Sequence, residues 1–349
     1  MKKMFIMASL YIAIVSCTKV SDDPAGSFLT GSGVFIINEG NFRWGNGSLS
    51  FYSYDSSKIY NDLFLNINDR PLGDVPNSMN IIDDKAYIVV NNSGKIEVIN
   101  LNTLESIKTI NGLISPRNIS FVNNNKAYVT SMYSDSVAII NLLDNSISDY
   151  INLRRSSEAV IISANKAFIS NWIGGNEVMV VNVENNEVID SIEVGQEPES
   201  MILDKNNKLW VLCNGGWTRD YYAELDVINT LTNSIEKTFV FPNKQTSPLC
   251  LRIDGNGETL YYLESGVRQM NIDASDLPSA PLISESEHYF YNLAINPVSS
   301  DIFITDAVDY SQQGYVLYYK KDGTLISIQE AGIIPGFMSF KLNDNFQVE

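Results

Sequence analysis

The sequence is short of histidine, cysteine and basic residues, and each shortage excludes a class of function. Its 24 Lys and Arg stand against 41 Asp and Glu, a formal net charge of −17. A nucleic acid is therefore not an expected partner, because binding one requires Lys and Arg to neutralise its phosphates. The single histidine, His288, is too few for a multi-histidine metal site or a paired-histidine mechanism. We expect no metal and no cofactor.

Common catalytic motifs are also missing, although the composition is that of a folded protein. No G-x-S-x-G elbow, H-E-x-x-H motif or Gly-rich phosphate loop occurs. The chain of 349 residues is 44% hydrophobic and 19% charged, which is typical of a globular protein. This length suggests two or three domains unless repeats hold one large unit together. These observations favour a non-enzymatic protein.

A secretion signal occupies the first residues. Lys2 and Lys3 precede an apolar run over residues 4–15, which is too short to span a bilayer as a stable helix. The next residues complete the sequence Ile-Val-Ser-Cys17, which resembles the lipobox of bacterial lipoproteins. That resemblance implies removal of residues 1–16 and lipidation of Cys17. An ordinary signal peptide with a chance cysteine is the alternative.

A polar tether is expected to follow the lipidated cysteine, over residues 17–32. Its Asp22-Asp23 pair resembles the surface-export signal of Bacteroidetes lipoproteins, with loose spacing from Cys17. No later apolar run is long enough to span a membrane. Loss of Lys2 and Lys3 leaves 22 bases against 41 acids, a charge of −19. We expect a lipid-anchored protein of the outer membrane that faces the cell surface.

A repeat of about forty residues fills the rest of the chain. KAYIVVN at 85, KAYVTSM at 126, KAFISNW at 166 and KLWVLCN at 208 lie 41, 40 and 42 residues apart, and related segments begin at 33, 259 and 301. Most have a short apolar segment upstream and two more downstream, rich in β-branched and aromatic residues and bounded by Asn, Asp and Gly. Four short strands per repeat are typical of a β-propeller blade. Helical repeats would need apolar residues at i, i+3 and i+4, which are absent.

The two ends of the repeat region predict how the ring closes. The first repeat begins at its second strand, at residue 33, and its missing innermost strand reappears at residues 335–341. A C-terminal strand that completes the first blade would remove the open sheet edge. We therefore predict an all-β protein, a single seven-bladed β-propeller domain over residues 33–349.

One face of this ring is predicted to bind a ligand. If the strands of a blade are lettered A to D outward from the axis, the B–C loops and D–A crossovers share one face, and several B–C loops are long and aromatic. Three of the four tryptophans fall in these loops, whereas Trp210 lies within a strand and is expected in the core. The alternative is that the aromatic rings pack the loops onto the sheets. The predicted ligand-binding residues are Phe42, Arg43, Trp44, Asn46, Arg117, Asn118, Tyr133, Asn171, Trp172, Asn176, Asn214, Trp217, Arg219, Tyr221, Tyr222 and Tyr310.

Two further groups of residues leave alternatives open. Acids at the ends of B strands could instead form a general acid/base pair or a cation site at the channel mouth, as in a hydrolase or lyase: Glu39, Glu177, Glu264 and Asp306. Cys213 and Cys250 lie near one face on adjacent blades. A disulfide between them is conceivable, but two buried thiols are the expectation.

The repeat segments resemble a known class of bacterial surface propellers. AYIVVNN (86–92) and AYVTS (127–131) resemble the YVTN-type repeat, and residues 33–53 behind a lipobox look like a family of Bacteroidetes surface lipoproteins. That family includes the BtuG-like propellers, which capture cobalamin (vitamin B12) and pass it to a TonB-dependent outer-membrane transporter. The resemblance implies capture of cobalamin or another corrinoid and a transporter partner. A protein-binding accessory subunit without a small ligand is a further alternative.

Overall fold

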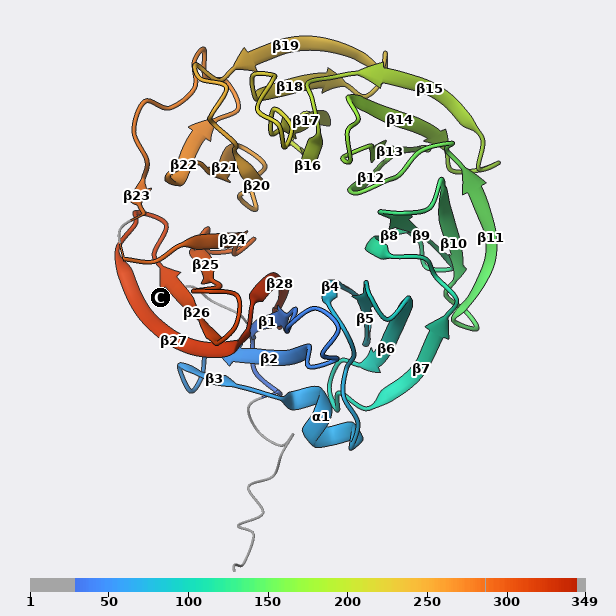
Figure 1. The fold of residues 1–349 in the computed structure, drawn as a ribbon, viewed down its shortest axis with the longest axis vertical. Helices are drawn as coiled ribbons and strands as arrows, with labels where there is room; N and C mark the ends of the chain where they lie inside the picture. Colours follow the sequence, from blue (N-terminus) through green and yellow to red (C-terminus); the bar gives the residue numbers. More distant parts are fainter. Residues whose placement is uncertain (1–28, 286, 344–349) are drawn as a thin grey trace, which may run out of the picture.

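Seven four-stranded antiparallel sheets stand around a central axis, as predicted (Figure 1). The computed structural model describes residues 29–285 and 287–343. The signal peptide, Cys17 and most of the tether lie outside these residues. Within them, no helix is both long and apolar enough to cross a membrane.

The blades follow one another along the chain, each with its strands in order from the axis outward except for the first. Blade 1 consists of β28 (Pro335–Lys341), β1 (Gly33–Asn38), β2 (Ser48–Ser53) and β3 (Lys58–Tyr60). Blade 2 consists of β4 (Pro76–Ile82), β5 (Lys85–Val90), β6 (Lys95–Asn100) and β7 (Ser106–Asn111). Blade 3 consists of β8 (Pro116–Asn123), β9 (Lys126–Ser131), β10 (Ser136–Asn141) and β11 (Ser146–Asn152). Blade 4 consists of β12 (Val160–Ser163), β13 (Lys166–Ser170), β14 (Glu177–Asn182) and β15 (Val188–Glu193).

The remaining three blades complete the ring. Blade 5 consists of β16 (Pro198–Leu203), β17 (Lys208–Cys213), β18 (Glu224–Asn229) and β19 (Ser234–Val240). Blade 6 consists of β20 (Leu249–Ile253), β21 (Thr259–Leu263), β22 (Gly266–Asn271) and β23 (Ile283–Ser284). Blade 7 consists of β24 (Phe290–Ile295), β25 (Ile302–Asp306), β26 (Gln313–Tyr319) and β27 (Leu325–Ile333).

The predicted closure of the ring is confirmed. The C-terminal strand β28 pairs antiparallel with β1, with Gly33 opposite Lys341 and Ile36 opposite Met338. β28 is the innermost strand of the first blade. The closing pair therefore joins the two ends of the propeller through backbone hydrogen bonds and leaves β1 with a partner on both sides.

Packing between blades explains why the second and third strands of each repeat are nearly continuous apolar runs. Both faces of these strands are covered by neighbouring blades, so all positions of β5 after its first residue are buried. The outermost strands, such as β15 and β19, are mostly exposed. Trp210 on β17 is 2% exposed, which confirms its predicted place in the core.

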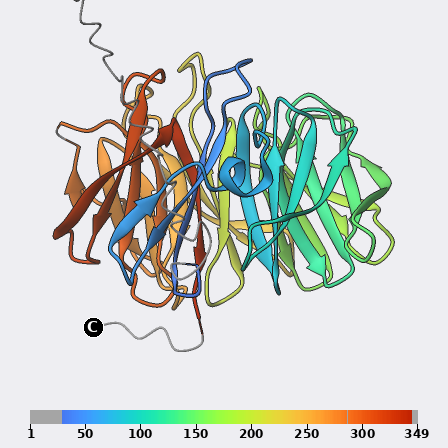
Figure 2. The ribbon, with the colours of Figure 1, turned by 90° about the horizontal axis from the view of Figure 1, so that it is seen from below.

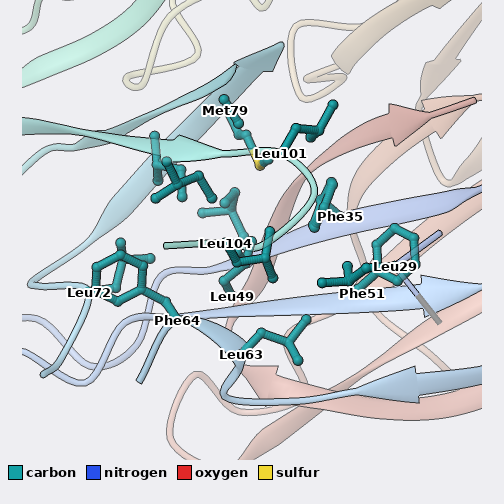
Figure 3. Close-up of a cluster of buried hydrophobic side chains, with 14 of the residues drawn as sticks. Leu29, Phe35, Leu49, Phe51, Leu63, Phe64, Leu72, Met79, Leu101 and Leu104 are labelled. Carbon is teal, nitrogen blue, oxygen red and sulfur yellow. The ribbon is translucent and has the colours of Figure 1, made fainter. Parts of the chain in front are cut away.

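One helix interrupts the repeat pattern and was not predicted. The helix α1 (Leu63–Asn68) lies in the crossover between blades 1 and 2 and buries Leu63 and Phe64. These two side chains join a cluster with Phe51 and Leu104 (Figure 3). The helix therefore covers the apolar surface that the three-residue outer strand β3 leaves open.

Repeated asparagines shape the C–D turns, which lie with the A–B turns on the face opposite the B–C loops. The last residue of β6 is Asn100, whose side-chain oxygen accepts hydrogen bonds from the backbone N–H groups of Asn102 and Thr103. Asn141, Asn182, Asn229 and Asn271 cap their own turns in the same way. These asparagines form Asx turns, which explains why an asparagine recurs at the end of the third strand in five of the repeats.

Candidate ligand-binding site at the axial mouth

The predicted aromatic residues lie on the face that carries the B–C loops, and most of them are exposed. Figure 2 shows the β1–β2 loop, in blue, rising from this face. Seven of the eight predicted rings are between 44% and 87% exposed: Phe42, Trp44, Tyr133, Trp217, Tyr221, Tyr222 and Tyr310. The eighth, Trp172, is partly buried. We call the seven exposed rings the aromatic rim.

The β1–β2 loop is held in place by hydrogen bonds to two neighbouring segments. The backbone N–H of Arg43 donates to both carboxylate oxygens of Asp74 at 3.0 Å, and the Asn41 amide donates to the Tyr310 carbonyl at 3.0 Å. Asn46 exchanges two hydrogen bonds with Asn41 across the loop. Trp44 is therefore presented to solvent on an anchored loop.

The β17–β18 loop presents a second group of exposed rings, on blade 5. Asn214 accepts a hydrogen bond from the Gly216 N–H at 3.0 Å, and the Arg219 guanidinium donates to the Gly216 carbonyl at 3.2 Å. The Lys244 ammonium, from the next crossover, lies 5.4 Å from the centroid of the Tyr222 ring, within cation–π range. Trp217, at the tip, is 87% exposed.

Several predicted polar ligand residues make hydrogen bonds that hold the loops themselves. Asn171 and Asn214 are each only 6% exposed, and the Asn171 amide donates to Ser156. Asn46 and Arg219 form hydrogen bonds within their own loops, as described above. The Asn176 amide donates to Glu193 at 3.4 Å. An asparagine in a loop sequence predicts that its side chain forms hydrogen bonds, but it does not predict whether the partner is a ligand or the protein itself.

Six side chains, each from a different blade, lie around the axis on the innermost strands or next to them. We call them the collar: Glu39, Arg117, Glu158, Glu199, Arg252 and Tyr291. Their charges influence one another across the ring, between blades that are not neighbours in the sequence as well as between adjacent ones. The charge of Arg117, on blade 3, acts on Glu39 of blade 1 and Tyr291 of blade 7. The charge of Glu158 acts on Glu199 of the neighbouring blade.

An ion pair between blades 3 and 4 is the strongest contact in the collar. Arg117 donates to both oxygens of Glu158, from Nε at 2.7 Å and from a terminal nitrogen at 2.8 Å. Glu158 is 8% exposed. The Asn118 amide donates to the backbone oxygen of Glu158 at 3.1 Å. Arg117 and Asn118, two of the predicted ligand-binding residues, therefore join blades 3 and 4 beside the axis.

Glu39 and Tyr291 connect the collar to the rim. The Tyr291 hydroxyl donates to Glu39 at 2.8 Å, and the Tyr310 ring stands edge-on to Tyr291 with centroids 5.6 Å apart. On the other side, the Arg117 guanidinium lies 5.8 Å from the centroid of the Trp172 ring. Burial raises the pKa of Glu39, although the Tyr291 hydrogen bond and the charge of Arg117 oppose this.

Glu199 and Arg252 complete the collar on blades 5 and 6. Glu199 accepts the backbone N–H of Cys250 at 3.0 Å, and Arg252 donates to the Asn292 side chain at 3.2 Å. Burial raises the pKa of Glu199 against the opposing effects of Ser200, Arg252 and the Cys250 N–H. Of the collar, sequence reasoning named only Glu39 and Arg117. Aligning the second residue of each innermost segment would have added Glu158, Glu199 and Tyr291.

Each acid of the alternative acidic site has a polar partner of its own. Its four carboxylates lie on four blades, each with its own partner: Glu39 with Tyr291, Glu177 with Arg155, Glu264 with Arg268, and Asp306 with His288. Over residues 29–285 and 287–343, no group of three His, Cys, Asp or Glu side chains is arranged to hold a metal ion.

The two cysteines are buried free thiols, as expected. Cys213 ends β17 and lies 3.9 Å from a carboxylate oxygen of Asp226, whereas the Cys250 sulfur lies 3.9 Å from the Tyr291 backbone oxygen. Burial raises the pKa of both thiols, that of Cys250 to about 12. Neither thiol is therefore set up as a nucleophile.

A small cavity lies between blades 2 and 3, with Pro116 and Thr130 in its wall. It has a volume of about 100 Å³ and is lined by residues that include Leu113, Ile114, Val129 and Tyr150. Pockets for drug-sized ligands usually measure about 300–1,000 Å³. This cavity is therefore too small to enclose a ligand of that size.

Comparisons with known proteins place this geometry in a family and a fold. Residues 32–328 match the family described as domain of unknown function DUF5074. No curated protein sequence matches the chain. A quinonprotein alcohol dehydrogenase-like protein from Bacteroides thetaiotaomicron is 17% identical, with a TM-score of 0.69 over 90% of this chain and 79% of its own.

Two further solved structures share the fold at low identity. A functionally unknown protein from Desulfotomaculum acetoxidans is 13% identical, with a TM-score of 0.70 over 90% of this chain and all of its own. The virginiamycin B lyase of Staphylococcus aureus is 13% identical, with a TM-score of 0.59 over 76% of this chain and 91% of its own. At these identities the likeness concerns the fold alone.

Proposed function

Because the chain belongs to the DUF5074 family, which has no known function, we propose its function from its own rim and collar. We propose that it is a capture protein that binds a small-molecule nutrient on the face of the B–C loops. Cobalamin or another corrinoid is the proposed ligand. The proposal includes a lipid anchor on Cys17, a place on the outer-membrane surface and delivery to a TonB-dependent transporter.

The exposure of the aromatic rim is the observation that carries this proposal. Monomeric proteins rarely gather large exposed rings on one surface unless it binds something. Burying one ring contributes roughly 1.5–3 kcal/mol, and nanomolar binding requires about 12 kcal/mol. Several rings must therefore act together, and the rim supplies seven, from 44% to 87% exposed.

The chemistry of a corrinoid matches this combination of surfaces. Cobalamin is broad, with an apolar ring surface and many amide side chains. Aromatic rings can cover its faces, while the donors and acceptors of the collar can meet its amides. The resemblance of the repeat segments and lipobox to cobalamin-capturing lipoproteins supports the same ligand.

Calorimetry with cyanocobalamin tests the proposal, and blade 5 offers a matched pair of variants. Trp217→Ala removes an 87% exposed ring from the ligand face, whereas Leu231→Ala removes an 85% exposed side chain from a C–D turn of the opposite face. We expect Trp217→Ala to weaken binding roughly tenfold, since one ring contributes about 1.5–3 kcal/mol. Leu231→Ala should leave the affinity unchanged.

Other outcomes would redirect the assignment. No binding of cyanocobalamin at micromolar concentration would exclude corrinoid capture. Equal losses in both variants would show that the rim is not the binding surface. Co-purification with a transporter without any bound small molecule would favour a protein-binding accessory subunit.

A further inference from the structure

The collar has one more carboxyl group than guanidinium groups, and both guanidinium groups already donate hydrogen bonds within the protein. Three carboxyl groups, Glu39, Glu158 and Glu199, accompany two guanidinium groups. Arg117 is engaged in two hydrogen bonds to Glu158. Arg252 donates to the Leu251 carbonyl at 2.9 Å and to Asn292. An anionic group entering the collar would meet this excess of carboxylates and find both cations occupied.

The collar also contains donors and acceptors suited to an uncharged polar group. Glu39 and Glu199 are only partly exposed, and each already accepts a hydrogen bond, from the Tyr291 hydroxyl and the Cys250 N–H respectively. The remaining lone pairs of these carboxylates can accept hydrogen bonds from the N–H groups of a ligand amide, whereas a ligand carboxylate has no N–H to donate. Two side-chain amides also contact collar residues: Asn118 donates to the backbone oxygen of Glu158, and Asn292 accepts from Arg252.

An unpaired donor next to the collar points in the same direction. The indole nitrogen of Trp172 is buried, and among the described residues it has no hydrogen-bond partner. The same side chain lies against Arg117 of the collar. Buried indole N–H groups usually have an acceptor, because an unmade hydrogen bond is costly. A ligand carbonyl would supply the missing acceptor.

We propose that the collar is a subsite that admits an uncharged, amide-bearing group of the ligand and discriminates against a carboxylate. This inference rests on the proposed capture function and adds which ligand group faces the axis. The aromatic rim provides area, whereas the collar provides the selection by charge.

Two ligands that differ in one group provide the test. Cyanocobalamin is compared with its monocarboxylic acids, in which one side-chain amide is hydrolysed to a carboxylate at neutral pH. We expect at least one of these acids to bind the wild-type protein roughly tenfold more weakly than cyanocobalamin, which corresponds to about 1.4 kcal/mol. Calorimetry at pH 7 measures both affinities.

Two variants assign the discrimination to the collar. Glu199→Gln removes one negative charge without changing the side-chain size, and we expect it to reduce the penalty of that acid to less than threefold. Trp217→Ala is the matched control on the rim and should weaken both ligands by the same factor. A discrimination that Glu199→Gln leaves intact would overturn the assignment to the collar.

The outcomes separate this inference from the proposed function. If every monocarboxylic acid binds as tightly as cyanocobalamin, the collar does not select against charge and the inference is wrong, while capture stands. If neither ligand binds, both proposals fail. The wild-type comparison needs no variant, so a failure of Glu199→Gln to fold would not leave the inference untested.

Discussion

Two buried carboxylates at equivalent positions of blades 2 and 5 are stabilised in opposite ways. Glu97 is the third residue of β6 and Asp226 the third residue of β18, and they are 0% and 1% exposed. Each lies opposite a threonine of the outer strand, Thr109 or Thr238, whose hydroxyl donates to it. The same carboxylate–threonine pair therefore occurs at equivalent positions of blades 2 and 5.

The surroundings of the two pairs differ in charge. Glu97 binds Arg70 from the preceding crossover at 2.6 Å and Lys95 at 3.1 Å. Burial alone would raise the pKa of Glu97, but Arg70, Ser106 and Lys95 outweigh it and lower the pKa. Blade 2 therefore contains a buried carboxylate that is kept ionised by cations.

Blade 5 provides no cation at the equivalent place. Asp226 accepts the Gly195 N–H at 3.0 Å from the crossover, and the residue equivalent to Lys95 is Glu224. Burial raises the pKa of both Asp226 and Glu224. Only glycine fits at 195, because a Cβ there would lie 2.8 Å from the Cβ of Cys213. The difference teaches that a crossover arginine and the first residue of the third strand, rather than the repeated carboxylate–threonine pair, set the direction of the pKa shift at this position.

Removing the crossover cation of blade 2 should have the largest effect. We expect Arg70→Met to destabilise the protein by roughly 3 kcal/mol at pH 7, because it leaves a buried carboxylate with one cation fewer. The free energy of unfolding in urea measures this. Arg154→Met, at an exposed crossover arginine, is the control and should change stability by less than about 0.5 kcal/mol. Similar values for both variants would contradict the comparison.

Neutralising the two carboxylates should change stability in opposite directions. Glu97→Gln leaves Arg70 and Lys95 without their carboxylate, and we expect a loss of about 2 kcal/mol at pH 7. Asp226→Asn removes a buried charge that has no cation, and we expect a gain of about 1 kcal/mol. Urea unfolding of both variants at one pH provides the measurement, and the same sign for the two would show that the sites are equivalent after all.

The pH dependence should isolate the unpaired acid of blade 5. Because the pKa of Asp226 is higher in the folded than in the unfolded protein, its contribution to stability is full below its ordinary pKa and is lost as pH rises through the folded value. The Asp226→Asn variant should therefore lose less stability than the wild type on going from pH 4 to pH 8. Parallel pH profiles of the unfolding free energy would argue against a raised pKa.

Glu97 should act at the acid end, with the opposite sign. Its pKa is lower in the folded protein, so its contribution is present above the ordinary value and disappears as pH falls through the folded value. Wild-type protein should lose stability below about pH 4 more steeply than Glu97→Gln. Urea midpoints between pH 2 and pH 5 measure the difference, provided that the variant is still folded there.

The smallest effect is expected at the thiol beside Asp226. Cys213→Ser replaces a weak donor, 3.9 Å from the carboxylate, by a hydroxyl that donates more strongly. We expect a change in stability of less than about 1 kcal/mol and a flatter loss of stability with rising pH. Native Cys213 and Cys250 should resist a maleimide and react only in denaturant. Reaction in the native state would contradict their burial.

Much of the fold follows from patterns that lie within a single blade. Four apolar segments, their spacing and the turn asparagines recur every forty or so residues, and each is a local property of strands and turns. The innermost strand missing at the start and present at the end predicted the closure by β28, which is confirmed. The helix α1 was missed because it is only six residues long and directly follows the outer strand β3, where the repeat pattern has no helix.

The candidate site was only partly predictable. Exposure of the aromatic rim follows from long loops on one face, and the structure places seven of eight rings there in the open. The roles of Asn171, Asn214 and Arg219 did not follow, since a loop side chain can bind the backbone as readily as a ligand. Glu158 and Glu199 were missed because neither belongs to a local motif: Glu158 precedes β12, and Glu199 is the second residue of β16.

By itself, the sequence determined the number of blades, their strand order, the closing strand and the face that carries the aromatic loops. Strand period and turn chemistry depend on residues that are close in the sequence, and the repeat spacing can be counted along it, so all three can be recognised from the sequence. Only the tertiary structure decided which side chains meet at the axis and which buried acid receives a cation. Those partners, such as Arg117 with Glu158 or Arg70 with Glu97, come from different blades or from crossovers, and their contact depends on where each side chain points once the ring is closed.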